Sequence, residues 1–303
     1  MMKIILLLSF VLLIFAEDVD FSRVNDWFES SRAAPGAGFS VIHNDEIVHQ
    51  YVTGVKKLGG DDLTTDTYFP IGSITKTMTT MLLHQLVVDK KCAWNSRIVS
   101  ILPFWECGDP SRSSMMTLED LVYHRTGFGA GTGSLPSFTN PKLSLHDYVY
   151  SLKYFHPLAE FRAPPLLYNN AGLSIAGLIA EVIEGEDYKH LLQERVLNLL
   201  ESEPVGYYSL GEMEEHHIDY ATGYMRIGPE EYITPPDYTD EFLSHSSAPA
   251  GGLALSLNGL TEFAQFFMKN ISDFEDMTTP GNIFPRGTLS LFNKLYVTPP
   301  GSW

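Results

Sequence analysis

Apolar residues recur every three or four positions in three stretches of the chain, the spacing at which side chains share one face of an α-helix. Residues 74–89 predict the first helix, whose apolar face is made of Met78, Leu82 and Leu86, with Met81 beside it. Residues 171–184 are apolar nearly all round and stop at Gly185, which predicts a helix buried on every side. Residues 187–200 predict a further helix with the inward residues Tyr188, Leu191, Leu192 and Val196.

Strands are predicted in two other places. Residues 38–55 predict two strands around a turn at Asn44 and Asp45, with flanking apolar positions at Phe39, Val41, Ile47 and Tyr51. Residues 251–269 predict a strand followed by a helix from about Gly259. Between them, residues 117–200 are mostly helices and loops, and the first of these helices begins at Thr117 with capping chemistry. The order of strands, helices and strands indicates an α/β domain interrupted by a helical one.

The first residues have the pattern of a secretory signal peptide. Lys3 precedes an apolar run from Ile4 to Ala16, which is followed by acidic residues. The alternative is a membrane anchor, but this run is too short to cross a bilayer comfortably. No other apolar run is long enough to do so. We therefore expect a secreted, extracellular, soluble protein that begins near Glu17.

The composition is that of a globular protein. Of 303 residues, 44% are hydrophobic and 19% charged, which is enough for one large domain or two smaller ones. The net charge of −17 disfavours binding to nucleic acid or an anionic membrane. It either keeps a secreted protein soluble or attracts cations or a mineral surface. The acidic and histidine-rich residues 214–219 lack metal-ligand spacing, so we expect no metal and no cofactor.

Two covalent modifications are suggested by the predicted secretion. Cys92 and Cys107 are the two cysteines of the chain. In an oxidising compartment a disulfide between them would close a short loop and stabilise the fold by roughly 3 kcal/mol. Two buried thiols are the alternative. Asn270 begins an Asn-x-Ser sequon and is a predicted glycosylation site.

Two short patterns carry candidate chemistry. Ser73 and Lys76 have the S-x-x-K spacing, which places both side chains on one face at the start of a helix. The helix N-terminus would favour an oxyanion formed on attack by the serine. Tyr168 and Asn170 share one side of an extended stretch, where a tyrosine can relay a proton and an asparagine can hold a lysine and a substrate carbonyl. Each pattern alone is weak, because Ser73 also suits an N-cap and Tyr-Asn is common in turns.

Together with their surroundings, these patterns carry a family resemblance. The chain resembles class C β-lactamases, DD-peptidases and related esterases, over about residues 35–303, and the matching stretches are residues 67–76, 118–127, 167–172 and 250–253. The resemblance implies a β-lactamase/transpeptidase-like α/β fold, an antiparallel sheet flanked by helices with an inserted, mainly helical domain. After the signal at 1–16, the domain would take up 17–303, with its α/β part at about 17–105 and 245–303 and the helical insertion at about 106–244.

The resemblance also implies a mechanism without metal. Ser73 would form an acyl-enzyme, Lys76 and Tyr168 would move the proton, and Asn170 would position the substrate. One oxyanion donor would be the Ser73 N–H and the other would come from a late strand. The family's third motif, Lys-Thr-Gly or His-x-Gly on that strand, is not found in this sequence. The resemblance therefore predicts that the last strands are missing at the C-terminus.

Rival sites and functions remain at this point. Residues 172–176 approximate the G-x-S-x-G elbow of α/β-hydrolases, but Ser174 falls inside a predicted helix rather than after a strand. His124 matches a family position near a turn and is interpreted as structural. The sequence therefore favours a secreted serine hydrolase acting on an ester, amide or peptide, with a small-molecule or peptide partner. The alternative is a non-catalytic acidic extracellular matrix protein that keeps the fold, as in family members of the calcified mollusc shell matrix.

Overall fold

The computed structural model describes residues 20–31, 34–133, 140, 142–162, 167–202, 204–228, 231–233 and 245–271. The predicted signal segment, the side chain of Asn270 and residues 272–303 lie outside this description. In the part of the chain that the structure describes, every helix is too short or too polar to cross a lipid bilayer.

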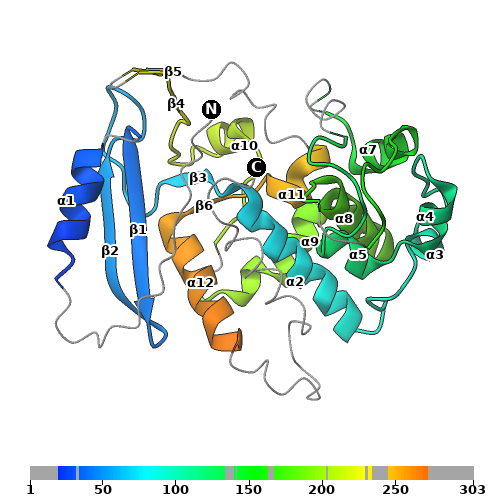
Figure 1. Ribbon diagram of the computed structural model, residues 1–303. Coiled ribbons are helices and arrows are strands. Elements are labelled where there is room, and N and C mark those ends of the chain that lie inside the picture. The colour runs from blue at the N-terminus through cyan, green and yellow to red at the C-terminus, as the bar shows by residue number, and fades with distance from the viewer. Residues whose placement is uncertain are drawn as a thin grey trace.

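The two strands predicted around Asn44 and Asp45 form a β-hairpin, which lies at one end of the molecule (Figure 1). β1 (Gly36–His43) and β2 (Glu46–Gly54) pair antiparallel. They are joined at Asn44 and Asp45, which both have the positive φ that suits a tight hairpin turn. A register shift between Val41 and Ile42 interrupts the ladder.

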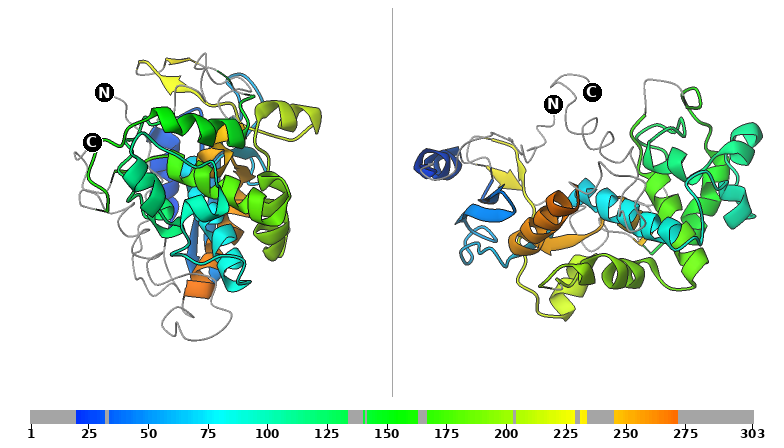
Figure 2. Two further views of the ribbon diagram at one scale, coloured as in Figure 1. Left: turned by 90° about the vertical axis from the view of Figure 1, so that its right-hand side faces the viewer. Right: turned by 90° about the horizontal axis from the view of Figure 1, so that it is seen from below.

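Helices cover both faces of this hairpin. α1 (Ser22–Ser31) packs on one face, where Phe28 stacks on Phe39 with ring centroids 4.6 Å apart. α12 (Leu257–Ile271) packs on the other face, where the Ser40 and Thr261 hydroxyls lie 2.7 Å apart. Figure 2 shows the same order of helix, hairpin and helix from below. We refer to α1, β1, β2 and α12 as the sheet side.

Most of the remaining helices pack around two central helices. We call this group, with the two central helices included, the helical side. α2 (Thr75–Val88) and α8 (Ala171–Glu184) pack against one another and are the predicted helices at 74–89 and 171–184. Around them lie α3 (Ile98–Ile101), α4 (Pro110–Met115), α5 (Leu118–Val122), α7 (Leu145–Ser151) and α9 (Tyr188–Arg195) (Figure 1). The core is centred here, because Leu82, Leu83 and Leu86 of α2 have no exposed surface.

A short strand pair joins distant parts of the chain beside α2. β3 (Tyr68–Pro70) pairs antiparallel with β6 (Ala254–Ser256), with Phe69 opposite Leu255. α11 (Ala248–Gly251) precedes β6 and therefore lies next to the start of α2. It also packs on α8, where a side chain at Gly177 would overlap the Pro249 ring. The remaining strands and α-helix of the described residues are β4 (Met225–Arg226), β5 (Tyr232–Ile233) and α10 (Leu210–Glu215), and further 3₁₀ turns lie at Leu152–Tyr154 and His245–Ser247.

The structure refines several predicted boundaries. The predicted helix at 187–200 ends at Arg195 and continues as the 3₁₀ turn Leu197–Leu199, but its four predicted inward residues are all buried. α12 begins at Leu257, two residues before the predicted Gly259. The predicted cap before α5 is confirmed, since the Thr117 N–H donates to the Asp120 carboxylate over 3.0 Å.

The structure contradicts the predicted disulfide. Cys92 and Cys107 are both free thiols. Cys107 is buried, and its thiol donates to the Asp109 carbonyl over 3.4 Å and accepts from the Ser113 hydroxyl over 3.3 Å. Cys92 is only partly buried and packs at the border of the core. The alternative of two unpaired thiols therefore holds in this structure.

Candidate active site

Ser73 lies in a 3₁₀ turn, Gly72–Ile74, directly between β3 and α2. The turn requires φ +53° at Gly72, a conformation that a residue without a side chain adopts freely. Ser73 is not the N-cap of α2, because that position is taken by Ile74 and no side chain caps the helix. The structure therefore corrects the N-cap interpretation. The Ser73 hydroxyl faces other side chains instead.

The Ser73 backbone N–H is available as a hydrogen-bond donor. Among the described residues, no hydrogen-bond acceptor takes it. It lies in the turn that leads into α2, where the partial positive charge of a helix N-terminus is expected. This N–H is therefore available to donate to an oxyanion that forms beside the hydroxyl, the role that the family resemblance implies for it.

Lys76 lies one helical turn after Ser73 and is 5% exposed. Its Nζ has three oxygen partners: Ser73 Oγ at 3.0 Å, Asn170 Oδ1 at 2.8 Å and the Ala250 carbonyl at 2.5 Å. An ammonium group has three protons, so these partners match its full hydrogen-bonding capacity. They come from the 3₁₀ turn before α2, the residue that precedes α8, and α11.

All three partners of Lys76 are uncharged, and this sets its protonation state. Burial lowers the pKa of the Lys76 ammonium to about 7, because the charged form is disfavoured away from water and, within the described residues, its partners carry no compensating charge. A lysine near its ordinary pKa would be almost fully protonated at neutral pH. Here a substantial fraction is the free amine, which can accept a proton.

Tyr168, in the stretch before α8, contacts both Ser73 and Lys76. Its hydroxyl donates to Ser73 Oγ over 2.6 Å, and its ring centroid lies 4.9 Å from Lys76 Nζ. Asn170, two residues later, directs its side chain to Lys76 rather than capping α8. The structure therefore brings together all four residues singled out from the sequence, and Ser73 Oγ lies between an amine and a phenol.

Two other contributors were not among the site residues expected from the sequence, although His124 matched a family position and was interpreted as structural. The Ala250 carbonyl is a backbone atom, so only the family-like stretch 250–253 pointed to this segment. His124 lies behind the site, with its ring centroid 4.6 Å from that of Tyr168. The rival serine, Ser174, is buried inside α8 and donates to the Ser246 carbonyl over 2.7 Å, so it is not on a strand-to-helix elbow.

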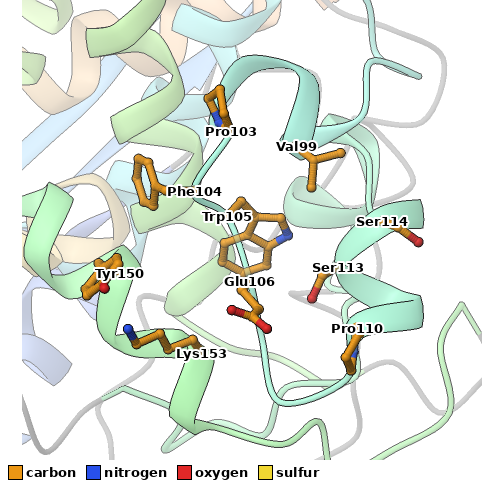
Figure 3. Close-up of a pocket in the computed structure, with 10 residues that line it drawn as sticks. All are labelled: Val99, Pro103, Phe104, Trp105, Glu106, Pro110, Ser113, Ser114, Tyr150 and Lys153. Carbon is orange, nitrogen blue, oxygen red and sulfur yellow. The ribbon is translucent and has the colours of Figure 1, made fainter.

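A separate pocket lies on the helical side (Figure 3). Its volume is about 530 Å³, and none of its ten lining residues belongs to the Ser73 cluster. The indole of Trp105 lies between Phe104 and Ser113 in its wall (Figure 3). The lining mixes aromatic rings with Glu106 and Lys153. This pocket is therefore distinct from the candidate active site.

Comparison with known proteins agrees with this geometry. Residues 23–287 match the family model described as beta-lactamase. The chain belongs to the beta-lactamase family. Among curated relatives, penicillin-binding protein 4 of Amycolatopsis lactamdurans is 22% identical over 80% of this chain and 62% of its own length. Unguisins hydrolase ungD' of Aspergillus campestris is 24% identical over 93% of this chain and 53% of its own length.

Solved structures confirm the predicted fold. The D-amino acid amidase from Ochrobactrum anthropi, complexed with L-phenylalanine amide, matches with a TM-score of 0.68 at 20% identity, over 88% of this chain and 72% of that one. The octameric penicillin-binding protein homologue from Pyrococcus abyssi matches with a TM-score of 0.67 at 18% identity, over 88% and 59%. The chain spans less than two thirds of the length of the two curated relatives, penicillin-binding protein 4 and the unguisins hydrolase.

Proposed function

We propose that this chain is a secreted serine hydrolase that cleaves an ester, amide or peptide bond of a small-molecule or peptide substrate through an acyl-enzyme on Ser73. The observation that supports it is the position of Ser73 Oγ, 3.0 Å from the Lys76 amine and 2.6 Å from the Tyr168 hydroxyl. Family membership supports the same reaction class.

The chemistry uses the residues in the following order. The free amine of Lys76 accepts the Ser73 hydroxyl proton, and Oγ attacks the substrate carbonyl carbon. The Ser73 N–H donates to the resulting oxyanion. When the bond to the leaving group breaks, that group takes the proton that Lys76 holds, either directly or through Tyr168, which donates its own proton and is reprotonated by Lys76. Water then attacks the acyl carbon, gives its proton to Lys76 and releases the acid, and the proton returns to Ser73.

The nucleophile can be tested directly. A fluorescent penicillin or a fluorophosphonate is expected to label the protein at Ser73, and Ser73→Ala to abolish labelling. Ser174→Ala is the matched control, because it removes the rival serine without touching the Ser73 cluster. Label found by peptide mapping on any other serine would refute the assignment.

Secretion can be tested separately from activity. Expression in a eukaryotic secretory host is expected to release a protein whose N-terminus begins near Glu17, because the apolar run 4–16 is read as a signal. N-terminal sequencing of the medium fraction checks this. Retention of Met1 in an intracellular product would contradict it.

The second candidate function is that of a non-catalytic, acidic extracellular matrix protein. The net charge of −17 favours it, since such a surface attracts cations on a mineral face. Binding to calcite powder that is lost at high salt, in a protein that no acylating probe labels, would support this alternative over the hydrolase. Probe labelling at Ser73 without calcite binding would remove it.

A further inference from the structure

His124 lies directly behind the active site without touching Ser73. It follows α5, has a positive φ of +54° and is 4% exposed. A positive φ is uncommon for a residue with a side chain, so its surroundings hold it in this conformation. Its ring contacts the ring of Tyr168, with centroids 4.6 Å apart and planes inclined by 41°.

The hydrogen bond of His124 reaches the backbone between two functional residues. The Asn169 N–H donates to Nδ1 of His124 over 3.3 Å. A ring nitrogen that accepts a hydrogen bond carries no proton, so the proton of the neutral ring is on Nε2. Nε2 is buried and has no partner among the described residues.

The charge state of His124 is compatible with this role. Burial, and after it the nearby Lys76 charge, lower the pKa of His124 to about 3. The ring is therefore neutral through the range in which Lys76 titrates, and its Nδ1 stays available as an acceptor. A protonated ring would lose this bond and place a second cation beside Lys76.

The side chain of Asn169 also contacts the segment after α5 that carries His124. Its side-chain amide donates to the Thr126 hydroxyl over 3.3 Å, and its Oδ1 accepts from the Gly172 N–H over 2.9 Å. Residue 169 joins Tyr168, which contacts Ser73, to Asn170, which contacts Lys76. A shift of the Asn169 backbone would therefore move both neighbouring functional side chains at once.

We propose that His124 is a positioning residue: its Nδ1 fixes the Asn169 peptide and its ring supports Tyr168, so that the Tyr168 hydroxyl and the Asn170 amide stay on Ser73 and Lys76. This inference rests on the proposed function, because it assigns a role within the same site. A purely structural residue would affect only the stability of the fold. A positioning residue also affects the acylation rate of each folded molecule.

Two variants separate the hydrogen bond from the ring contact. His124→Asn keeps a side-chain acceptor near Nδ1 and tolerates positive φ, but lacks the ring. His124→Phe keeps a ring against Tyr168 but leaves the buried Asn169 N–H without a partner. With a fluorophosphonate, we expect the acylation rate per folded molecule to fall on the order of 10- to 100-fold in His124→Phe, because small displacements of reacting groups cost about that much. His124→Asn is expected to recover at least part of that loss.

Each outcome decides the proposal. Thermal melts and titration of folded protein correct the rates for stability, so lower melting temperatures with unchanged rates in both variants would overturn it. The ¹⁵N shifts of the His124 ring, identified by their loss in His124→Asn, give a readout independent of activity. We expect a neutral ring protonated on Nε2 at pH 5–8, and a ring protonated on Nδ1 or charged in this range would also overturn it. The expected ring state in a wild-type protein that no probe acylates would instead refute the proposed function and leave His124 without a rate to control.

Discussion

The sheet side and the helical side of the molecule differ in how completely they bury their side chains. Among the described residues, no position of β1 or β2 is fully buried, although both faces of the hairpin are covered by a helix. On the helical side, ten consecutive residues from Ala171 to Ala180 of α8 are buried, and so are most residues of α2.

This difference in burial indicates which part of the molecule fixes the geometry of the site. Close packing restricts side chains to single rotamers, and functional groups on packed elements are held more exactly than those on loosely covered ones. Ser73, Lys76, Asn170 and the Ala250 carbonyl all come from elements that contact α2 or α8. The helical side therefore positions the chemistry, and the sheet side contributes little to it among the described residues.

Lys76→Arg tests the chemical end of this comparison and has the largest expected effect. Arginine stays protonated at every working pH and cannot accept the Ser73 proton. The acylation rate constant with a fluorophosphonate is expected to fall by about 10³-fold, within the range that a lost general base costs. A thermal melt checks that the variant folds. A folded Lys76→Arg protein that reacts at the wild-type rate would show that Lys76 only supports the structure.

Leu82→Ala and Val41→Ala compare the packing of the two sides. Leu82 has no exposed surface, so its truncation leaves a cavity and is expected to lower the free energy of unfolding by about 3–4 kcal/mol. Val41 in β1 is only partly buried, so its truncation is expected to cost about 1 kcal/mol. Urea unfolding of both variants measures the difference. Equal losses of unfolding free energy in the two variants would show that the sheet side and the helical side are packed alike.

Lys76→Met tests the cost of burying an amine on the helical side. The folded-state pKa is about 7 and the ordinary one 10.5, so between these values the unfolded chain binds more protons than the folded one. The charged lysine therefore destabilises the fold fully below pH 7, and the penalty disappears as pH rises toward 10.5. Lys76→Met is expected to raise the free energy of unfolding at pH 6 by about 1–3 kcal/mol, because it removes this penalty but also the hydrogen bonds of Nζ.

The control is the same measurement at pH 9, where the gain from Lys76→Met is expected to shrink. Lys153→Met provides a matched lysine outside the site, whose Nζ lies 3.7 Å from the Tyr150 ring centroid. Its effect on stability is expected to be small, as for an exposed cation–π contact. A stability gain that is the same at pH 6 and pH 9 would contradict a lowered pKa at Lys76.

The cysteines give the smallest expected effect. Both thiols are free, so the unfolded, unreduced protein is expected to take up two alkyl groups by intact mass. In the native protein Cys107 should be protected by burial, and Cys92 should react slowly, because burial raises the pKa of its thiol to about 11. Cys92→Ser is expected to change the unfolding free energy by less than about 1 kcal/mol. If the unfolded, unreduced protein took up no alkyl group, Cys92 and Cys107 would be joined by a disulfide.

Spacing together with the family resemblance found the residues of the site but not their protonation state. The helical spacing of Ser73 and Lys76 and the extended spacing of Tyr168 and Asn170 were each weak alone, and the matching stretches around them made both pairs predictable. The Ala250 carbonyl could not, because a backbone oxygen has no residue type. The protonation of Lys76 and His124 depends on burial by elements far away in the chain. The disulfide prediction was wrong because compartment and cysteine number do not determine where two thiols point.

The contact between Gly177 and Pro249 has a consequence for how this sequence can change over time. Gly177 lies two turns inside α8, far along the helix from Asn170, yet the residue after Pro249 is Ala250, whose carbonyl holds Lys76. A mutation that adds even a methyl group at position 177 would overlap the Pro249 ring, so the proline or α8 must shift. Sequence change at position 177 is therefore tied to the segment that carries the Ala250 carbonyl, and a larger residue there calls for a compensating change near residue 249.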